Sequence, residues 1–321
     1  MSTAPFSSTT PAPLSGHQIR LALGDQSAVV TDVGAKVRSY SVGDREVFTP
    51  FDQDEPAPAG HGGVLVPWPN RIRDGRYVFD GVERQLDITE PQRGTALHGL
   101  AMWQRWHVVT EGSALDAAHT QGRATTLELR LAPSGGYPFD LLVRVTYRLT
   151  VDGLHVRTVA TNLGSSTAPY GVGFHPWLSP GEGSLDDCAV RLDASTRVTV
   201  DERLLPTGTI PVDGVYDLRA PRPMRGLDLD DAYVDVLRDE RGLSWIRLTG
   251  VDGRTAAVWM DESMDTWQVC SGDHLDAVDY RRTGLAAEPM SCIADAFRTG
   301  DRLVRLAPGA SHEVTWGATL I

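Results

Sequence analysis

Residues 143–159 read VRVTYRLTVDGLHVRTV. Runs of apolar and β-branched residues stand on both sides of Asp152-Gly153, and an Asp-Gly pair favours the type I′ turn of a tight hairpin. The segment therefore predicts two antiparallel strands, residues 143–151 and 154–159, joined by a short turn.

The same dipeptide recurs elsewhere in the chain, each time with apolar or β-branched residues close by. Its other positions are Asp74-Gly75, Asp80-Gly81, Asp213-Gly214 and Asp252-Gly253. Each of them is predicted to turn a hairpin.

Several segments alternate between apolar and polar residues, which places one face of a strand in a core. The apolar positions are Leu127, Leu129 and Leu131; Ile246 and Leu248; and Val314, Trp316 and Ala318. With 32 glycines and 20 prolines spread along 321 residues, a long helix has few places to form. No fixed-period repeat and no linker follow residue 16, so we expect a flexible tail over residues 1–15 and one all-β domain over residues 16–321. That domain is predicted to be a large antiparallel β-sandwich rather than a propeller.

The charge balance excludes several classes of partner. Lys and Arg number 30 against 42 Asp and Glu, a net charge of -12, which argues against binding to nucleic acid or to an anionic membrane. Lys36 is the only lysine, so Schiff-base chemistry and phosphate-loop lysines have almost no candidate. The three cysteines lie far apart and no stretch is long enough to span a bilayer, which favours a reduced, cytoplasmic setting and a small neutral partner.

Two histidines and a glutamate stand in settings that suit acid/base chemistry. His175 and Glu288 each precede a proline, which restricts the backbone, and both have apolar neighbours that would desolvate them. Burial raises the pKa of a carboxyl toward the working pH of a general base. A buried structural histidine and a carboxylate paired with an arginine are the plainer readings. His98 lies beside Gly99, where the missing side chain allows backbone or ligand to come close.

Other polar residues stand in stiff or apolar surroundings. Asn70 and Arg71 follow Pro67 and Pro69, whose fixed φ angles would aim both side chains, although a surface arginine is the simpler reading. Asp230 and Gln268 are flanked by apolar residues and could contact a ligand or cap their own backbone.

Taken in order, these segments resemble the aldose 1-epimerase (mutarotase) family over nearly the whole chain. The matching stretches are Asn70-Arg71-Ile72-Arg73-Asp74-Gly75, Leu97-His98-Gly99, Phe174-His175-Pro176-Trp177, Asp230-Asp231-Ala232-Tyr233, Gln268 with Ser271-Gly272, and Glu288-Pro289-Met290.

The resemblance implies a galactose mutarotase-like β-sandwich that interconverts the α and β anomers of a free aldose such as glucose or galactose. It implies that Glu288 is the general base and His175 the general acid. The residues implied to hold the sugar are Asn70, Arg71, His98, Asp230 and Gln268. No metal and no other cofactor is implied, and the protein is expected to be a monomer or a homodimer.

Three alternatives remain at the level of sequence. A hexose-phosphate 1-epimerase of the same fold would need arginines around the pocket to hold the phosphate. A sugar-binding protein without turnover would keep the fold and lose the chemistry. A metal-dependent β-barrel enzyme would use some of the nine histidines, but no H-x-H or H-x-x-x-H spacing occurs.

Overall fold

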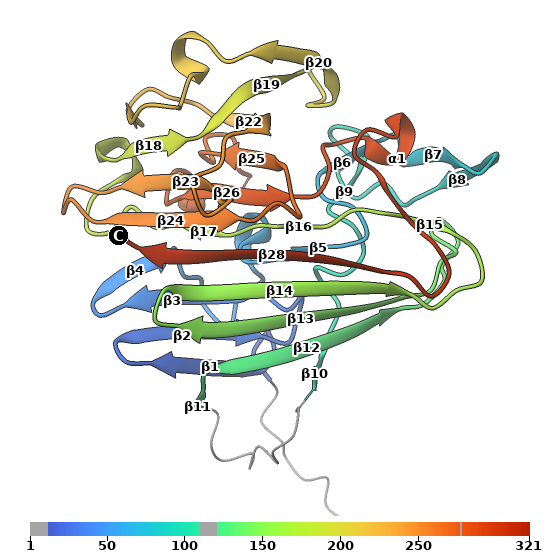
Figure 1. The fold of residues 1–321 in the computed structure, drawn as a ribbon, viewed down its shortest axis with the longest axis horizontal. Coiled ribbons are helices and arrows are strands. Elements are labelled where there is room, and N and C mark those ends of the chain that lie inside the picture. The colour runs from blue at the N-terminus through green and yellow to red at the C-terminus, as the bar shows by residue number, and fades with distance from the viewer. Residues whose placement is uncertain (1–11, 110–120, 277) are drawn as a thin grey trace, which may run out of the picture.

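Two large β-sheets form most of the protein, as the computed structural model shows for residues 12–109, 121–276 and 278–321 (Figure 1). Within these residues, the first sheet has 13 strands. In sequence order they are β1 (Gln18–Leu23), β2 (Gln26–Thr31), β3 (Val37–Val42), β4 (Arg45–Phe48), β5 (Val64–Leu65), β11 (Gln121–Gly122), β16 (Gly173–Phe174), β17 (Trp177–Leu178), β19 (Ala194–Val200), β20 (Pro206–Pro211), β22 (Asp230–Val236), β25 (Thr266–Cys270) and β26 (Leu285–Met290).

The second sheet has nine strands in the same described residues. They are β10 (His107–Val109), β12 (Ala124–Leu131), β13 (Leu141–Thr150), β14 (Gly153–Asn162), β18 (Ala189–Leu192), β21 (Arg222–Pro223), β23 (Ser244–Thr249), β24 (Thr255–Met260) and β28 (Ser311–Leu320). The long strands β13, β14 and β28 lie side by side at its centre (Figure 1).

Short elements complete the described fold. Three small two-stranded sheets pair β6 (Arg71–Arg73) with β9 (Thr95–Leu97), β7 (Arg76–Phe79) with β8 (Val82–Gln85), and β15 (Ala168–Tyr170) with β27 (Val304–Leu306). The helical turns are η1 (Pro58–Gly60), η2 (Leu185–Asp187), η3 (Gly214–Tyr216), η4 (Val278–Tyr280) and α1 (Ala296–Thr299). None of the described helices has the length and apolar character needed to cross a membrane.

The predicted antiparallel sandwich is confirmed. Nearly all strand pairs are antiparallel, the short contact between β1 and β11 being parallel. The predicted alternation is confirmed as well, since Leu127, Leu129 and Leu131 in β12 are all buried in the core. Side chains from both sheets, such as Val145 on β13 and Ala287 on β26, belong to one hydrophobic cluster.

Three of the five predicted Asp-Gly hairpins are confirmed. Asp80-Gly81 joins β7 to β8, Asp152-Gly153 joins β13 to β14, and Asp252-Gly253 lies in the loop from β23 to β24. The prediction is wrong for Asp74-Gly75, because β6 pairs with β9 and β7 with β8, so the turn links two different sheets. It is also wrong for Asp213-Gly214, where Gly214 begins the helical turn η3.

Residues 1–11 of the expected tail lie outside the described residues, whereas Ser15 is buried and its hydroxyl donates a hydrogen bond of 2.8 Å to the Gln53 carbonyl.

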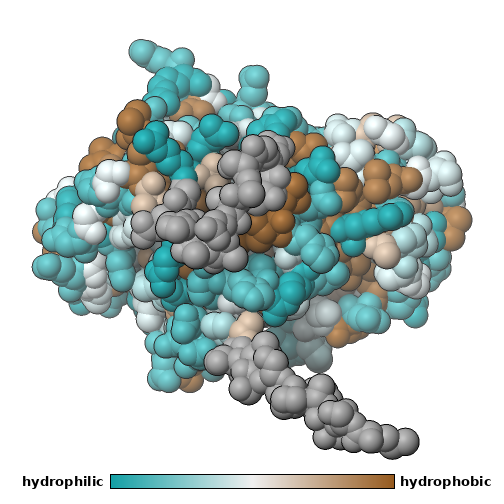
Figure 2. Space-filling model, turned by 90° about the horizontal axis from the view of Figure 1, so that it is seen from below, coloured by the Kyte–Doolittle hydropathy of each residue, from teal (hydrophilic) through white to brown (hydrophobic). Residues whose placement is uncertain are grey.

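The face drawn in Figure 2 is largely hydrophilic, with apolar side chains interspersed among the polar ones. Cys188, Cys270 and Cys292 are free thiols.

Candidate active site

Strand alternation places Glu288 and Gln268 on the face of the first sheet that is turned away from the sandwich core. Ala287 on β26 and Val269 on β25 belong to the core cluster, and neighbouring side chains in a strand point to opposite faces. Glu288 and Gln268 are direct partners in the register of these strands. Asp230 on β22 lies diagonal to Gln268 on the same face, close enough for the two side chains to interact.

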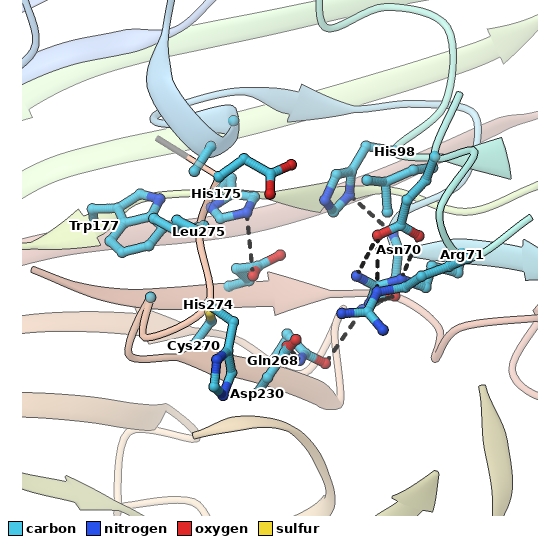
Figure 3. A pocket seen from close by; sticks show the side chains of 18 of the residues that line it. Asn70, Arg71, His98, His175, Trp177, Asp230, Gln268, Cys270, His274 and Leu275 are labelled. Carbon is cyan, nitrogen blue, oxygen red and sulfur yellow. Dashed lines mark hydrogen bonds and ion pairs between the residues drawn. The ribbon is translucent and has the colours of Figure 1, made fainter. Parts of the chain in front are cut away.

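Glu288 is almost completely buried, with 2% of its surface exposed. Its Oε1 lies 3.4 Å from His175 Nε2, while Oε2 has no hydrogen-bond partner among the described residues. In Figure 3 the dashed line that starts at the ring of the labelled His175 marks this contact. The distance is longer than a good N–H···O bond, and such contacts often tighten only when substrate binds.

His175 is held by the backbone between β16 and β17. Its N–H donates to the Gly63 carbonyl at 3.1 Å, and its own carbonyl accepts from the Gly62 N–H at 2.8 Å. The ring lies parallel to the Trp177 indole at 5.8 Å between centroids and meets the His98 ring edge-on at 5.4 Å. His175 thus lies between two short strands that both pair with β26, the strand that carries Glu288.

Burial shifts both groups toward their uncharged forms. It raises the pKa of Glu288 well above its ordinary value, the nearby Asp230 raises it further, and the Arg71 charge acts in the opposite direction. Burial also lowers the pKa of His175 to about 4. Burial thus favours a neutral imidazole and raises the proton affinity of the carboxyl, and these are the properties of a proton acceptor and a proton donor that can exchange roles.

A chain of polar side chains leads away from the pair. Arg71 donates to Asn70 Oδ1 at 3.3 Å, Asn70 Nδ2 donates to Gln268 Oε1 at 3.3 Å, and Gln268 Nε2 donates to Asp230 Oδ1 at 2.6 Å. Each hydrogen bond fixes the orientation of the next amide. The chain thereby sets which donors and acceptors face a ligand.

His98 has a defined tautomer. The Asn70 backbone N–H donates to His98 Nδ1 at 3.2 Å, so this nitrogen is an acceptor and Nε2 carries the hydrogen. Burial, with the neighbouring His175 and Arg71, lowers the pKa of His98 well below its ordinary value. Asn70 and His98 also share left-handed backbone angles, φ 55° and φ 60°, a strain that persists only where the surroundings hold it.

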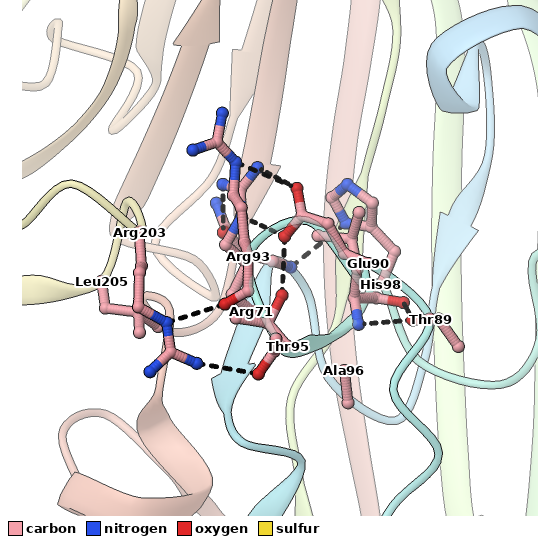
Figure 4. Close-up of polar contacts among 12 residues, drawn as sticks. Arg71, Thr89, Glu90, Arg93, Thr95, Ala96, His98, Arg203 and Leu205 are labelled. Atoms are coloured by element: carbon pink, nitrogen blue, oxygen red, sulfur yellow. Dashed lines mark hydrogen bonds and ion pairs between the residues drawn. The ribbon is translucent and has the colours of Figure 1, made fainter. Parts of the chain in front are cut away.

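Glu90 is a site residue that the sequence reasoning missed. Its carboxylate accepts two hydrogen bonds from Arg71, at 2.8 Å from Nε and 3.0 Å from NH2, and a third from the Thr95 hydroxyl at 2.6 Å (Figure 4). Arg93 adds an ion pair at 3.2 Å. The available signal was Glu90-Pro91, the same arrangement that marked Glu288-Pro289.

All seven residues predicted for the site line a single cavity of about 440 Å³. They are Asn70, Arg71, His98, His175, Asp230, Gln268 and Glu288 (Figure 3). Other lining residues, which the sequence did not single out for the site, include Trp103, Asp228, His274 and Asp276. Among the described residues, no three His, Cys, Asp or Glu side chains converge in a way that could hold a metal ion.

Comparison with known proteins agrees with this architecture. A family model described as aldose 1-epimerase matches residues 17–318. The protein YihR of Escherichia coli K12, whose function is uncharacterised, is 34% identical over 303 residues, which cover 94% of this chain and 92% of YihR. A galactose mutarotase of Rattus norvegicus is 34% identical over 174 residues, which cover 50% of this chain and 45% of the mutarotase.

Solved structures share the fold. A GalM/aldose epimerase homologue from C. elegans superposes with a TM-score of 0.81 at 19% identity, covering 95% of this chain and 98% of the homologue. A putative aldose 1-epimerase from Escherichia coli K12 gives 0.79 at 21% identity, covering 95% and 99%. With the family model matching almost the whole described sandwich, the chain belongs to the aldose 1-epimerase family.

Proposed function

We propose that the protein interconverts the α and β anomers of a free aldose, with Glu288 and His175 as the acid/base pair. The observation that carries the proposal is the approach of Glu288 Oε1 to within 3.4 Å of His175 Nε2 at the buried end of a polar cavity. Opening a hemiacetal ring needs one proton acceptor and one proton donor on opposite sides of a short O–C–O unit. Glu288 and His175 supply these two groups side by side in one cavity.

In the proposed reaction, Glu288 removes the proton of the anomeric hydroxyl while His175 donates a proton to the ring oxygen. The bond between the anomeric carbon and the ring oxygen breaks, and the anomeric carbon becomes an aldehyde. After rotation about the adjacent carbon–carbon bond, the former ring oxygen attacks the other face. His175 then takes back its proton and Glu288 returns its own to the new hydroxyl.

This cycle keeps the number of protons on the pair constant. A charged pair, carboxylate with imidazolium, and a neutral pair, carboxylic acid with imidazole, each hold one shared proton. A sugar between them would stabilise the charged pair, because its hydroxyl donates to the carboxylate and its ring oxygen accepts from the imidazolium. The Arg71 charge, which lowers the pKa of Glu288, acts in the same direction.

The remaining hydroxyls of the sugar are bound by a polar cradle, which consists of Asn70, Arg71, His98, Asp230 and Gln268. Asp230 accepts hydrogen bonds, His98 Nε2 donates, and the amides of Asn70 and Gln268 do both. Arg71 gives three N–H bonds to Glu90 and Asn70 and retains others for a sugar. Such fixed contacts favour a ligand whose hydroxyls match them over one that leaves them unpaired.

The charge of the cavity weighs against a phosphorylated sugar. Arg71 and Arg93 are its lining arginines, and both are paired with Glu90. The lining also carries the carboxylates of Glu90, Asp228, Asp230, Asp273 and Asp276, which would repel a phosphate. These charges favour a neutral aldose over a hexose phosphate.

The test is anomer exchange measured by polarimetry or NMR on freshly dissolved glucose and galactose. At substoichiometric protein we expect equilibration well above the spontaneous rate, insensitive to dialysis against a chelator. A sugar-binding protein without turnover would leave the spontaneous rate unchanged, and that result would overturn the proposal.

A further inference from the structure

His61 is a buried histidine that the proposed mechanism does not use. Its side chain is 1% exposed, and it is not among the described residues that line the cavity. A polar side chain buried this deeply needs hydrogen-bond partners or another reason for its place in the fold. Nε2 of His61 has no partner among the described residues, so hydrogen bonding accounts for only one of its two ring nitrogens.

The ring of His61 is neutral and has one tautomer. Burial, with the nearby His175, lowers the pKa of His61 to about 3, so the ring is uncharged near neutral pH. Nδ1 donates a hydrogen bond to the Pro58 carbonyl, which also accepts one from the His61 backbone N–H at 2.9 Å. Because a carbonyl only accepts, Nδ1 carries the hydrogen and Nε2 has none. His61 therefore acts through its shape and its place, and does not exchange protons.

The ring of His61 stacks on the indole of Trp177. The two rings are inclined by 5°, and their centroids are 4.4 Å apart. Trp177 in turn lies parallel to the His175 ring, inclined by 7° with 5.8 Å between centroids (Figure 3). Phe51 and Tyr280 meet the His61 ring edge-on at 6.4 Å and 6.1 Å. His61 thus packs against three aromatic side chains, one of which lies beside the predicted catalytic histidine.

The backbone around His61 binds the backbone of His175. The Gly62 N–H donates to the His175 carbonyl at 2.8 Å, and the His175 N–H donates to the Gly63 carbonyl at 3.1 Å. A side-chain carbon added at Gly60 would stand 3.1 Å from the His175 ring, so the turn also passes close beside the imidazole. The residues on both sides of His61 therefore help to fix where the His175 ring lies.

The His175 ring lacks a hydrogen bond that would fix its orientation. Its Nδ1 is buried without a hydrogen-bond partner among the described residues. Its Nε2 lies 3.4 Å from Glu288 Oε1, which is longer than a good N–H···O bond. The bond made by one nitrogen of an imidazole usually sets the state of the other. In this site the packing of Trp177 and the backbone around His61 take over that task.

We propose that His61 is a positioning residue for the acid/base reaction, which supports Trp177 and, through Trp177, fixes the His175 imidazole against Glu288. The inference rests on the proposed function, because it takes His175 to be the group that exchanges a proton with the ring oxygen. The place of this imidazole has to be accurate, since a displacement of about 1 Å can cost about 10²-fold in rate.

Two variants separate the ring of His61 from its hydrogen bond. His61→Phe keeps a flat ring on Trp177 and lacks the donor, whereas His61→Asn keeps a donor for the Pro58 carbonyl and lacks the ring. Anomer exchange of glucose is measured for both variants and for His61→Ala, with kcat and KM determined separately.

His312 provides the matched controls, His312→Phe and His312→Asn. Its Nδ1 is also buried without a partner among the described residues, and its ring meets Tyr170 edge-on at 5.7 Å. It is not among the described residues that line the cavity. Both controls should leave kcat unchanged.

We expect His61→Asn and His61→Ala to lower kcat by about 10- to 100-fold and to change KM by less than about threefold, because the residues that bind the sugar are intact. His61→Phe should keep kcat within about threefold of the wild type. Trp177→Leu with His61→Ala should be no slower than Trp177→Leu alone, since both changes break the same contact. The inference would be overturned if kcat in His61→Ala stayed within about threefold, or if it fell in His61→Phe as far as in His61→Asn.

NMR titration of the His175 imidazole gives a second result that does not depend on turnover. In the wild type, burial lowers the pKa of His175 to about 4. In His61→Ala, water enters beside Trp177, so this pKa should rise toward the ordinary value of about 6.5, whereas His61→Phe should keep it low. An unchanged pKa in His61→Ala would overturn the inference. Absence of anomer exchange in the wild type would overturn the proposed function instead, and the titration would still test whether His61 holds His175 in place.

Discussion

Glu90 and Glu288 are both buried glutamates followed by proline. They differ in the hydrogen-bond partners of their carboxyl groups, and this difference indicates different roles. Glu90 accepts hydrogen bonds from Arg71 and Thr95, whereas one oxygen of Glu288 has no hydrogen-bond partner among the described residues. A satisfied buried carboxylate holds structure in place, and an unsatisfied one at a cavity is available for chemistry. Local sequence cannot distinguish the two, because the partners come from distant segments.

Replacing Glu288 by Gln should remove nearly all anomerase activity. The amide keeps the size of the side chain but cannot take the hydroxyl proton, and a proton transfer of this kind contributes about 10²–10⁴-fold to the rate. Sugar affinity should stay within about tenfold, because the cradle is intact. Exchange NMR and calorimetry measure the two quantities, and retained turnover would remove Glu288 from the mechanism.

The pH profile should show an acid limb near pH 4. The pair is active with one shared proton, and a second proton enters when His175 is protonated, which burial delays to a pKa of about 4. On the alkaline side activity falls once the shared proton is lost, and burial raises the pKa of Glu288 well above its ordinary value. We therefore expect no change in kcat/KM around pH 6.5, which is about where an exposed histidine titrates. A limb near that ordinary value in a pH–rate series would contradict the assignment.

Replacing Glu90 by Gln should destabilise the protein at neutral pH by on the order of 3 kcal/mol, because it leaves Arg71 buried without its counter-charge. Burial raises the pKa of Glu90, but the hydrogen bond and charge of Arg71, with Thr95 and Arg93, outweigh it and the net shift is downward. The carboxylate thus stabilises the fold above its unfolded pKa, and that stabilisation is lost as pH falls through the lower folded value.

Denaturant unfolding at neutral and at strongly acidic pH measures the Glu90 effect. The difference between wild type and Glu90→Gln should shrink in acid. Glu83→Gln, at an exposed position of β8, is the matched control and should be nearly neutral. A Glu90→Gln deficit that stays the same at both pH values would argue against the ion pair as its cause.

At the scale of elements, the sequence predicts strands better than connections. Alternation located β12, β23 and β28 because one face of each strand must be buried. The Asp-Gly pairs predict five turns. They do not determine the partner with which each flanking strand forms its hydrogen bonds. At Asp74-Gly75 the flanking strands pair with more distant segments, so the local hairpin does not form.

The sequence also predicts part of the site, namely the residues that local motifs mark. Prolines marked Glu288 and His175, and the order of motifs pointed to the residues that line the cavity. The Arg71–Glu90 pair depends on a partner from another segment, since Glu90 lies 19 residues from Arg71 in sequence. Only folding brings those groups together.

Gly99→Ala should displace His98 and weaken sugar binding. Gly99 has φ 72°, and an added Cβ would stand 2.2 Å from the Val66 carbonyl oxygen, so the backbone must shift. We expect a loss of more than about 1 kcal/mol in unfolding free energy and a raised KM. The matched control is Gly81→Ala, which has φ 77° and open space around the added carbon. Equal effects of both variants on KM would show that the close approach at Gly99 does not position His98.

At the scale of the whole molecule, one hydrophobic cluster takes side chains from both sheets. The prediction that residues 16–321 form one domain therefore implies that the sheets unfold together. Calorimetry should show a single transition in which the calorimetric and van't Hoff enthalpies agree. Two transitions, or a stable proteolytic fragment that contains one sheet, would contradict it.

The catalytic arrangement likewise depends on the whole molecule. Glu288 and His175 are 113 positions apart in sequence, yet they meet within 3.4 Å because β26 pairs with both β16 and β17. The sandwich core on one face of the first sheet fixes this register, and the cavity occupies the other face.

The proposed roles of Glu288 and His175 are tested most directly by a crystal structure of the Glu288→Gln variant with a bound aldose. This variant is expected not to catalyse the exchange of the two anomers in the crystal. We predict that the side chain at position 288 lies within hydrogen-bond distance of the anomeric hydroxyl and that His175 Nε2 lies equally close to the ring oxygen. A sugar bound with its anomeric carbon away from both groups would contradict the proposed reaction.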